Sequence, residues 1–287
     1  MRIRTINSHE WSRREALAAA ATLACAWAVP GRADQTPSGP LPLQTTGLEH
    51  VGMVVPDQKA SADWYGRIFD PQLFQERDPP PRYYVRMGSA YLAFGGTPAT
   101  DATPKIDHFC ALVKNYKPDE MRAAIEKAGI KISAGRFGMP TDDDGIRMQL
   151  LPVPGGLAKT IIPSTRITTD NAAIEAVGLD HIVLAVTDLD RGSSYYAKFF
   201  GSPSSKKAGQ VWFQVANTRL ALEPVASGGR PAIQRLCFRV AGFDKKVVAS
   251  KLQKLQVETT TAQGGHALRF RDPNGFTIEL VGEPRKA

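Results

Sequence analysis

The sequence predicts an α+β protein of four βαβββ modules that pair into two mixed-sheet domains. Two segments, 47–55 (GLEHVGMVV) and 178–186 (GLDHIVLAV), match almost position for position. Helix-like and hairpin-like segments follow both of them in the same order. Two further related segments, 106–113 (IDHFCALV) and 233–240 (IQRLCFRV), each open a second unit. Such self-similarity along a chain is typical of a fold built from copies of one unit.

The first and third modules share the elements that follow their opening strands. In each, a stretch rich in aromatic residues predicts a helix, and an alternating apolar pattern then predicts a hairpin. These segments are 61–69, 192–200, 83–94 and 211–222. We expect the hairpin turns at Gly88–Ser89 and Asn217–Thr218.

The second and fourth modules each have a helix and a closing strand of one type. Apolar residues spaced i, i+4, i+7 predict one buried helix face. They are Met121, Ile125 and Ala128 in one helix, and Val248, Leu252 and Leu255 in the other. The closing segments begin with DDDG (142–145) and DPNG (272–275), whose composition predicts hairpin turns in which glycine supplies the positive φ.

The repeats divide the chain into five regions. We expect a signal peptide over 1–33, a flexible leader over 34–46, a first domain over 47–156, a linker over 157–176 and a second domain over 177–283.

The N-terminus is expected to be a targeting segment. Arg13 and Arg14 precede a charge-free apolar run over 16–29, and Ala33 is a suitable cleavage site. Fourteen residues at about 1.5 Å each span roughly 21 Å, too short for a stable membrane span. The paired arginines resemble a bacterial twin-arginine signal. That resemblance implies export to the periplasm as a folded protein, with any metal inserted beforehand.

The composition limits the kinds of partner that we expect this protein to bind. The net charge of +8 comes without a Lys/Arg cluster interleaved with aromatic residues, so we expect no nucleic-acid partner. Cys110 and Cys237, in apolar strand-like runs, are expected to be buried free thiols rather than a disulfide framework. We expect a small-molecule substrate or ligand, and a monomer or homodimer.

Together, the opening pattern H-[IV]-x-x-x-V and the closing pattern D-x-x-G-x-x-x-[EQ]-L resemble the vicinal oxygen chelate superfamily, which includes glyoxalase I, bleomycin-resistance proteins and extradiol dioxygenases. The resemblance implies that each pair of modules curls into a cup. It also implies that metal ligands come from the first strands of both modules and from their last strands. Inward positions on neighbouring strands then converge on one point.

Transferred residue by residue, the resemblance gives each half four ligand positions. They are His50, Ala93, His108 and Gln149 in the first half, and His181, Ala221, Arg235 and Glu279 in the second. Alanine has no donor atom, which disfavours the four-ligand glyoxalase arrangement. A three-ligand site like that of the ring-cleaving dioxygenases is left, with Fe(II) or Mn(II) as the expected metal.

The halves depart from that pattern in different places. Arg235 has no lone pair to give, so we expect an Arg235–Glu279 ion pair in a degenerate second site, with His181 as a core histidine. The first half keeps two imidazoles but has the neutral Gln149 in place of a carboxylate. We expect His50, His108 and Gln149 to be the metal ligands, with metal-free binding left open.

Two further side chains are candidates for a catalytic role. Tyr84, on the first hairpin, and Arg147, which has the strand parity of Gln149, are expected to line the cup and steady an acidic or phenolic substrate. The first functional hypothesis is an exported metalloprotein with dioxygenase-like activity on a small molecule with adjacent oxygens, a glyoxalase-like lyase or isomerase being indistinguishable from it. The alternative is a metal-free binding protein of the bleomycin-resistance type. It is suggested by Gln149, Arg235 and the aromatic residues Trp64, Tyr83, Tyr84 and Trp212.

Overall fold

The structure is a computed structural model. It describes residues 41, 43–77, 82–95, 103–133, 138–167, 171–207 and 209–283. By their contacts, residues 37–287 form one compact unit. The expected signal peptide and most of the leader lie outside the described residues.

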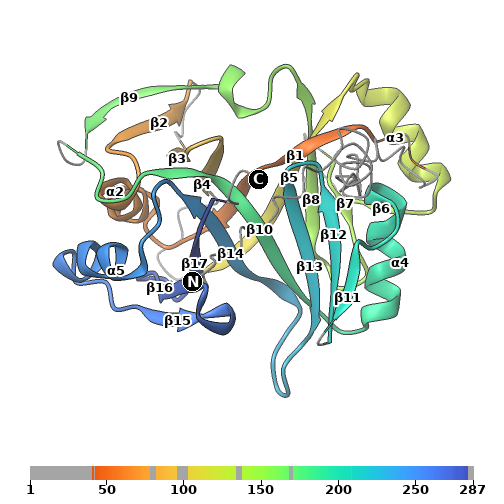
Figure 1. Ribbon diagram of the computed structural model, residues 1–287. Coiled ribbons are helices and arrows are strands. Elements are labelled where there is room, and N and C mark those ends of the chain that lie inside the picture. The colour runs from red at the N-terminus through yellow and green to blue at the C-terminus, as the bar shows by residue number, and fades with distance from the viewer. Residues whose placement is uncertain are drawn as a thin grey trace, which may run out of the picture. The chain divides into compact units, whose positions relative to one another are not determined.

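The four βαβββ modules predicted from the sequence are confirmed (Figure 1). The first contains β1 (Thr45–Val54), α2 (Gln58–Ile68), β2 (Gln72–Glu76), β3 (Tyr83–Met87) and β4 (Ala90–Gly95). The second contains β5 (Lys105–Lys114), α3 (Pro118–Lys127), β6 (Lys131–Ile132), β7 (Pro140–Thr141) and β8 (Arg147–Val153). The third contains β10 (Ala176–Val186), α4 (Leu189–Phe200), β11 (Ser205–Lys207), β12 (Gln210–Val215) and β13 (Thr218–Pro224). The fourth contains β14 (Ala232–Val240), α5 (Lys245–Lys254), β15 (Thr260–Ala262), β16 (Ala267–Arg271) and β17 (Thr277–Gly282).

The modules pair into two mixed sheets, which are cup-shaped and do not close into barrels. The strand orders are β6-β7-β8-β5-β1-β4-β3-β2-β9 and β11-β12-β13-β10-β14-β17-β16-β15. In each sheet the two opening strands lie antiparallel at the centre, and the closing strand of each module pairs with its opening strand in parallel. The predicted α+β class is therefore confirmed.

Part of the expected linker belongs to the first sheet. After a short 3-10 helix, η1 (Leu157–Lys159), residues Ile161–Ile167 form β9, which pairs with β2. The edge strand β2 offers unpaired backbone groups, and β9 satisfies them. The division of the chain at 157–176 stays a prediction.

Local signals explain where the helices begin. Asp57, Asp188 and Asp244 cap α2, α4 and α5 by accepting hydrogen bonds from backbone N–H groups of the first turn. The helix α3 instead begins at Pro118, whose missing N–H costs nothing at that position.

Two details differ from the sequence expectation. Leu255 does not join the buried face of α5 and is 37% exposed, because the helix ends at Lys254. Val257 takes the core position, and its N–H donates to the Leu252 carbonyl. The second hairpin turns at Ala216–Asn217, one residue early, since Thr218 already pairs with Val215.

The two halves are tied by a symmetric pair of buried hydrogen bonds. Tyr65 on α2 donates to Asp272, which begins the DPNG turn, at 3.0 Å. Tyr196 on α4 donates to Asp142, which begins the DDDG turn, at 2.9 Å. Each helix thus anchors the turn of the other half. Burial raises the pKa of both carboxyl groups, and hydrogen bonds from backbone N–H groups and from the tyrosine partly oppose that rise.

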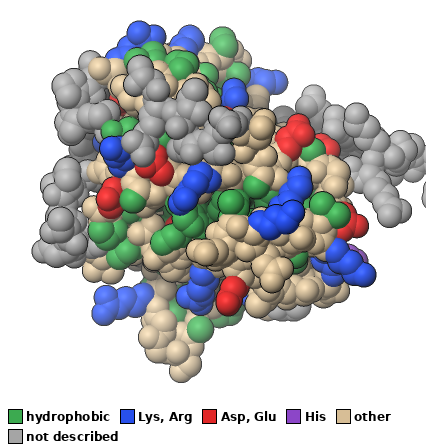
Figure 2. Space-filling view, turned by 90° about the vertical axis from the view of Figure 1, so that its left-hand side faces the viewer, with side chains coloured by type: hydrophobic (Ala, Val, Ile, Leu, Met, Phe, Trp, Pro, Cys, Tyr) green, Lys and Arg blue, Asp and Glu red, His purple; other side chains and the backbone are tan. Residues whose placement is uncertain are grey.

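The surface reflects the basic composition. On the face in Figure 2, lysine and arginine side chains stand around exposed apolar surface. Within the described part of the chain, no helix is both long enough and apolar enough to cross a membrane.

Candidate metal centre

Two rows of side chains cross the concave face of the first sheet, which we call the first cup. Cross-strand pairing aligns Tyr84, Ala93, Gly52, His108 and Arg147 in one row. Paired residues of neighbouring strands point to the same face of a sheet.

The second row runs beside the first. It contains Arg86, Tyr91, His50, Cys110 and Gln149. The three predicted ligands therefore lie on one face. Their role as metal ligands stays a prediction.

A β-bulge shapes the site at each opening strand. Between Leu48 and Val51 the strand β1 has one residue more than β5, so Glu49 and His50 together face Cys110. A bulge lets neighbouring side chains point to the same face, which a regular strand forbids. The same irregularity occurs on the other three opening strands, at Asp107–His108, Asp180–His181 and Gln234–Arg235.

Each bulge brings a polar side chain against the residue that follows it. Glu49 lies 3.1 Å from Nδ1 of His50, and Asp107 lies 3.0 Å from Nδ1 of His108. A carboxylate at Nδ1 favours the tautomer with its proton there, so Nε2 keeps its lone pair for a metal.

The imidazoles and the amide lie within reach of one another. The ring centroids of His50 and His108 are 5.5 Å apart and nearly perpendicular. Nε2 of His50 lies 2.9 Å from Oε1 of Gln149. His50 is only 2% exposed and Gln149 6%, so the centre of the site is screened from water.

The contact between His50 and Gln149 tests whether this site suits a cation. With the proton of His50 on Nδ1, Nε2 is an acceptor, and so is a carbonyl oxygen. Two acceptors in contact require a proton or metal ion between them, or the amide turned to present its NH₂. Two ligand atoms that each lie about 2.1 Å from a metal ion, and that form a right angle at the ion, lie about 3.0 Å apart. The 2.9 Å distance agrees with that spacing and equally with a hydrogen bond from a turned amide. The donor set itself, two imidazoles and an amide oxygen, is one that divalent metal ions accept.

Electrostatics keep His108 suited to a ligand role. Burial lowers its pKa, and the nearby Asp107 opposes that only in part, so the ring is neutral at pH 7. For Asp107, burial acts to raise the pKa, but hydrogen bonds from His108 and Arg147 outweigh it and hold the pKa well below the usual range. Arg147 forms an ion pair with Asp107. It thus reaches the site, but through the carboxylate that orients His108.

A glycine makes room for His108. Gly52 pairs with His108 across β1 and β5, and a Cβ at position 52 would overlap the imidazole ring. The residue at the same place in the second half is Val183, which is buried. At this place the first sheet has the room that the His108 ring fills, and the second sheet has a valine side chain opposite Arg235.

The first cup is covered by the segment that follows β8. Leu157 and Ile161 form an apolar cluster with Tyr84 and Ala93. The N–H of Leu157 donates to both carboxylate oxygens of Glu49, at 2.9 and 3.2 Å. The cover is thus tied to the carboxylate that orients His50.

The structure places Tyr84 in the cup and only 2% exposed. Its hydroxyl donates to Glu76 at 2.7 Å. Burial, supported by the Glu76 carboxylate, raises the pKa of the phenol far above its usual range. Tyr84 is therefore a neutral group at physiological pH. Its catalytic role, like that of Arg147, stays a prediction.

We call the corresponding face of the second sheet the second cup. At its centre, Arg235 stands where the first cup has His108. Its guanidinium makes a bidentate pair with Glu223, with both N–O distances at 2.7 Å. Glu279, the expected partner, lies farther away at 3.7 Å and is held by Arg269 at 2.6 Å. The expected ion pair exists, but as one link of a larger network.

His181 lies buried in the second cup. Its Nδ1 is 2.7 Å from Asp180, and its ring meets Trp212 edge-on at 5.1 Å between centroids. Two groups of possible ligands therefore occur among the described residues, with donor atoms within 4.8 Å of one another: Glu49, His50 and Cys110, and Asp180, His181 and Cys237. Both cysteines are buried free thiols, as expected.

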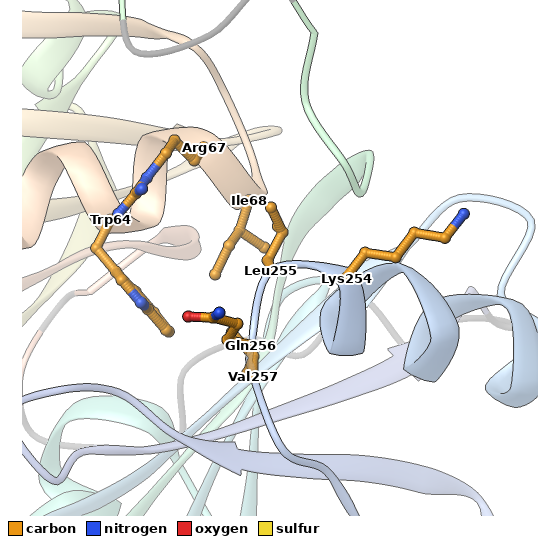
Figure 3. Close-up of a pocket in the computed structure, with 7 residues that line it drawn as sticks. All are labelled: Trp64, Arg67, Ile68, Lys254, Leu255, Gln256 and Val257. Atoms are coloured by element: carbon orange, nitrogen blue, oxygen red, sulfur yellow. The ribbon is translucent and has the colours of Figure 1, made fainter.

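The aromatic residues that suggested a binding protein lie in different places. Trp212 faces the second cup, whereas Tyr83 packs against the main core. Trp64 lines a cavity of about 230 Å³ between α2 and the end of α5, where its indole faces Gln256 (Figure 3). They do not form one aromatic site.

Sequence reasoning missed the carboxylates that orient the imidazoles. Glu49 and Asp107 directly precede their histidines, and strict alternation would put neighbours on opposite faces. The signal was present as the repeated acidic residue before His50, His108 and His181. Only the bulges reveal its meaning.

Comparison with known proteins supports the fold. Among solved structures, similar ones include the Mn(II)-bound glyoxalase from Novosphingobium aromaticivorans, with 18% identity, a TM-score of 0.60 and 84% of this chain and 83% of that chain covered. The 2,3-dioxygenase LapB from Pseudomonas sp. KL28 has 13% identity and a TM-score of 0.61, over 84% and 94% of the chains. A catechol 2,3-dioxygenase has 18% identity and a TM-score of 0.61, over 85% and 90%. At these identities the likeness shows the fold alone.

No curated protein sequence matches the chain. The family model described as Glyoxalase/Bleomycin resistance protein/Dioxygenase superfamily matches residues 47–150 and 178–280, most of the chain. These two ranges contain both cups and all four opening strands. The chain therefore belongs to this superfamily, the vicinal oxygen chelate proteins.

Proposed function

We propose that the first cup holds one divalent metal ion through His50, His108 and Gln149, and that the protein is a dioxygenase-like enzyme. Its substrate would be a small molecule with two adjacent oxygen atoms. The observation that carries the proposal is a buried site in which two imidazoles each have a carboxylate at Nδ1 and the Gln149 amide lies 2.9 Å from Nε2 of His50.

Fe(II) or Mn(II) is the expected metal. Three protein ligands with open positions suit such an ion, and the family includes a Mn(II)-bound glyoxalase and catechol dioxygenases. When bound, the ion would supply Lewis-acid polarisation of the substrate oxygens. Glu49 and Asp107 would hold the two imidazoles in their ligating tautomer.

The remaining residues would shape the space above the metal. Arg147 fixes Asp107 and adds positive charge beside His108. The apolar cluster of Leu157, Ile161 and Tyr84 would exclude water and contact the body of the substrate. Because Leu157 is tied to Glu49, substrate entry requires the cover to move.

Metal binding is the direct test. The full chain is incubated anaerobically with Fe(II) or Mn(II), desalted and analysed for bound metal. We expect about one ion per chain, and loss of that ion in His108→Ala. His266→Ala, which removes an exposed histidine, is the matched control and should keep the ion. Metal content near zero in the wild type, or equal in His108→Ala, would contradict the proposal.

The neutral ligand offers a second, independent test. Gln149→Glu supplies the carboxylate that the second half has at Glu279, so we expect at least about ten-fold tighter metal binding from the added charge neutralisation. Oxygen consumption with a catechol, measured in parallel, reports the reaction class. Weaker metal binding in Gln149→Glu would count against Gln149 as a ligand.

A metal-free binding protein is the second candidate. The apolar cover over the first cup and the missing anionic ligand favour it. In that case, a proton or a turned amide satisfies the His50–Gln149 contact. Metal-free protein that binds a catechol as tightly as metal-loaded protein, without consuming oxygen, would support this candidate over the enzyme.

We also propose export by the twin-arginine route, on the basis of Arg13, Arg14 and the apolar run that follows. Fusing residues 1–40 to a folded reporter should send it to the periplasm. Replacing both arginines by lysine should keep the reporter in the cytoplasm. Continued export of that double variant would overturn the proposal.

A further inference from the structure

A basic cavity of about 470 Å³ opens beside Arg235 of the second cup, and its lining includes Lys105 and Ile106 on the strand that carries His108. Its wall combines the start of β5, the start of β14 and the strands β16 and β17. Four cationic side chains line it: Lys105, Arg235, Arg269 and Arg271. Its volume falls within the range of small-molecule sites.

A row of hydrogen-bond donors crosses the floor of this cavity. Arg235 pairs with Thr277, and Thr277 pairs with Arg271, on three neighbouring strands. Two guanidinium groups thus flank a hydroxyl on one face of the sheet. Guanidinium groups only donate, in a planar arrangement that matches a carboxylate.

Part of this row is already fixed and part is available. Glu223 holds both terminal nitrogens of Arg235, which sets the position of that side chain. Arg269 places Nε and Nη2 on Glu279. Within the described part of the chain, the Arg271 guanidinium and the Thr277 hydroxyl have no hydrogen-bond partner, so they can meet a ligand.

At its β-bulge, the fourth opening strand lacks the acidic residue that the other three opening strands have. Glu49, Asp107 and Asp180 each precede the site residue of their opening strand, whereas the fourth opening strand has the neutral Gln234. Gln234 also lines the cavity and accepts a hydrogen bond from Arg235 at 2.8 Å. An acid at 234 would add a negative charge to the cavity wall and repel a carboxylate ligand.

We propose that the second cup binds a small organic carboxylate with an apolar body. The carboxylate would be held by Arg271 and Thr277. The other three cations of the wall are ion-paired, Lys105 with Asp107, Arg235 with Glu223 and Arg269 with Glu279, so Arg271 supplies the charge for the ligand. Ile106, Ile233 and Phe276 form the apolar part of the wall and suit the rest of the ligand. In this proposal, the second cup binds an anion at the place where the first cup would bind a metal ion.

Calorimetric titration of the full chain with benzoate tests the inference, with benzamide as the neutral analogue and inorganic phosphate as an anion without an apolar body. We expect saturable benzoate binding that weakens as salt rises, little binding of benzamide, and weaker binding of phosphate than of benzoate. Equal binding of phosphate and benzoate, or of benzamide and benzoate, would overturn the assignment.

Two variants locate the site. Arg271→Gln should weaken benzoate binding about ten-fold, because a charge-assisted hydrogen bond is lost at an exposed side chain. Gln234→Glu should abolish binding by placing a carboxylate among the arginines. Arg122→Gln, an exposed arginine on α3, is the matched control and should bind as the wild type does.

Thermal melts of all variants check folding. Benzoate binding should persist in His108→Ala, which separates this inference from the metal proposal. Unchanged benzoate affinity in both folded variants, Arg271→Gln and Gln234→Glu, would refute the site.

Discussion

The two cups share one frame and differ in what they hold at its centre. Where the first cup has Gly52 and His108, the second has Val183 and Arg235. The first places two imidazoles and an amide around a point screened from water, and the second fills the corresponding point with ion pairs. Gly52, on the opening strand β1, leaves the room that the His108 ring occupies, and Val183 stands at the same place opposite Arg235.

The partners of the closing strands complete the contrast. Gln149 contacts His50, whereas Glu279 is held by Arg269 and lies near Arg235. Glu279 thus has its carboxylate among arginine side chains, and Gln149 has its neutral amide beside an imidazole. Each half is therefore electrostatically consistent by itself.

The largest effect is expected when the first half receives the valine that the second half has at position 183. In Gly52→Val, the added side chain overlaps the His108 ring, so we expect bound metal to be lost and the free energy of unfolding to fall by about 1–3 kcal/mol. Metal analysis and denaturant unfolding measure the two. Adding His108→Ala to Gly52→Val should recover stability but not metal. Full metal content in Gly52→Val would show that His108 is not a ligand.

Removing the central cation of the second cup should cost stability instead of metal. In Arg235→Met, the carboxylate of Glu223 loses its bidentate partner, and both side chains are less than a fifth exposed. We expect a loss of about 2 kcal/mol in the free energy of unfolding, with bound metal unchanged. An equally stable variant would mean that the ion-pair network contributes nothing to folding.

The next largest difference between the halves is expected when the carboxylates that orient the histidines are replaced. Glu49→Gln removes the negative charge beside His50 and leaves one amide oxygen for both the imidazole and the Leu157 N–H, so we expect metal affinity to fall about 10- to 100-fold. Asp180→Asn makes the matching change in the second half and should leave metal affinity unchanged. Equal losses in both variants would place the metal elsewhere.

The smallest effect is expected where the halves agree. Burial raises the pKa of Asp142 and Asp272 above the unfolded value of about 3.9, so the folded state binds their protons more tightly. This contribution to stability is full below about pH 3.9 and is lost as the pH rises through the raised folded-state pKa.

Asp142→Asn and Asp272→Asn remove that titration. Relative to either variant, the wild type should lose stability as the pH rises from 4 towards neutral, and the two variants should behave alike. Denaturant unfolding across that range measures it. A pH dependence that differs from the wild type in only one of the two variants would show that the tyrosine–carboxylate ties are not equivalent.

The sequence by itself determined the four modules, their order, and the positions of His50, His108 and Gln149 on one face. Repetition and strand alternation carry that information because they act over a few neighbouring residues. The same reasoning placed Arg235 where a ligand is missing.

Only the tertiary structure decided which neighbours those residues have. The bulges turn Glu49 and Asp107 towards the histidines against simple alternation, and Leu157 closes the first cup from outside the repeat. The row of Arg235, Thr277 and Arg271 forms through pairing of three strands. Such contacts depend on register between distant segments, which no local pattern encodes.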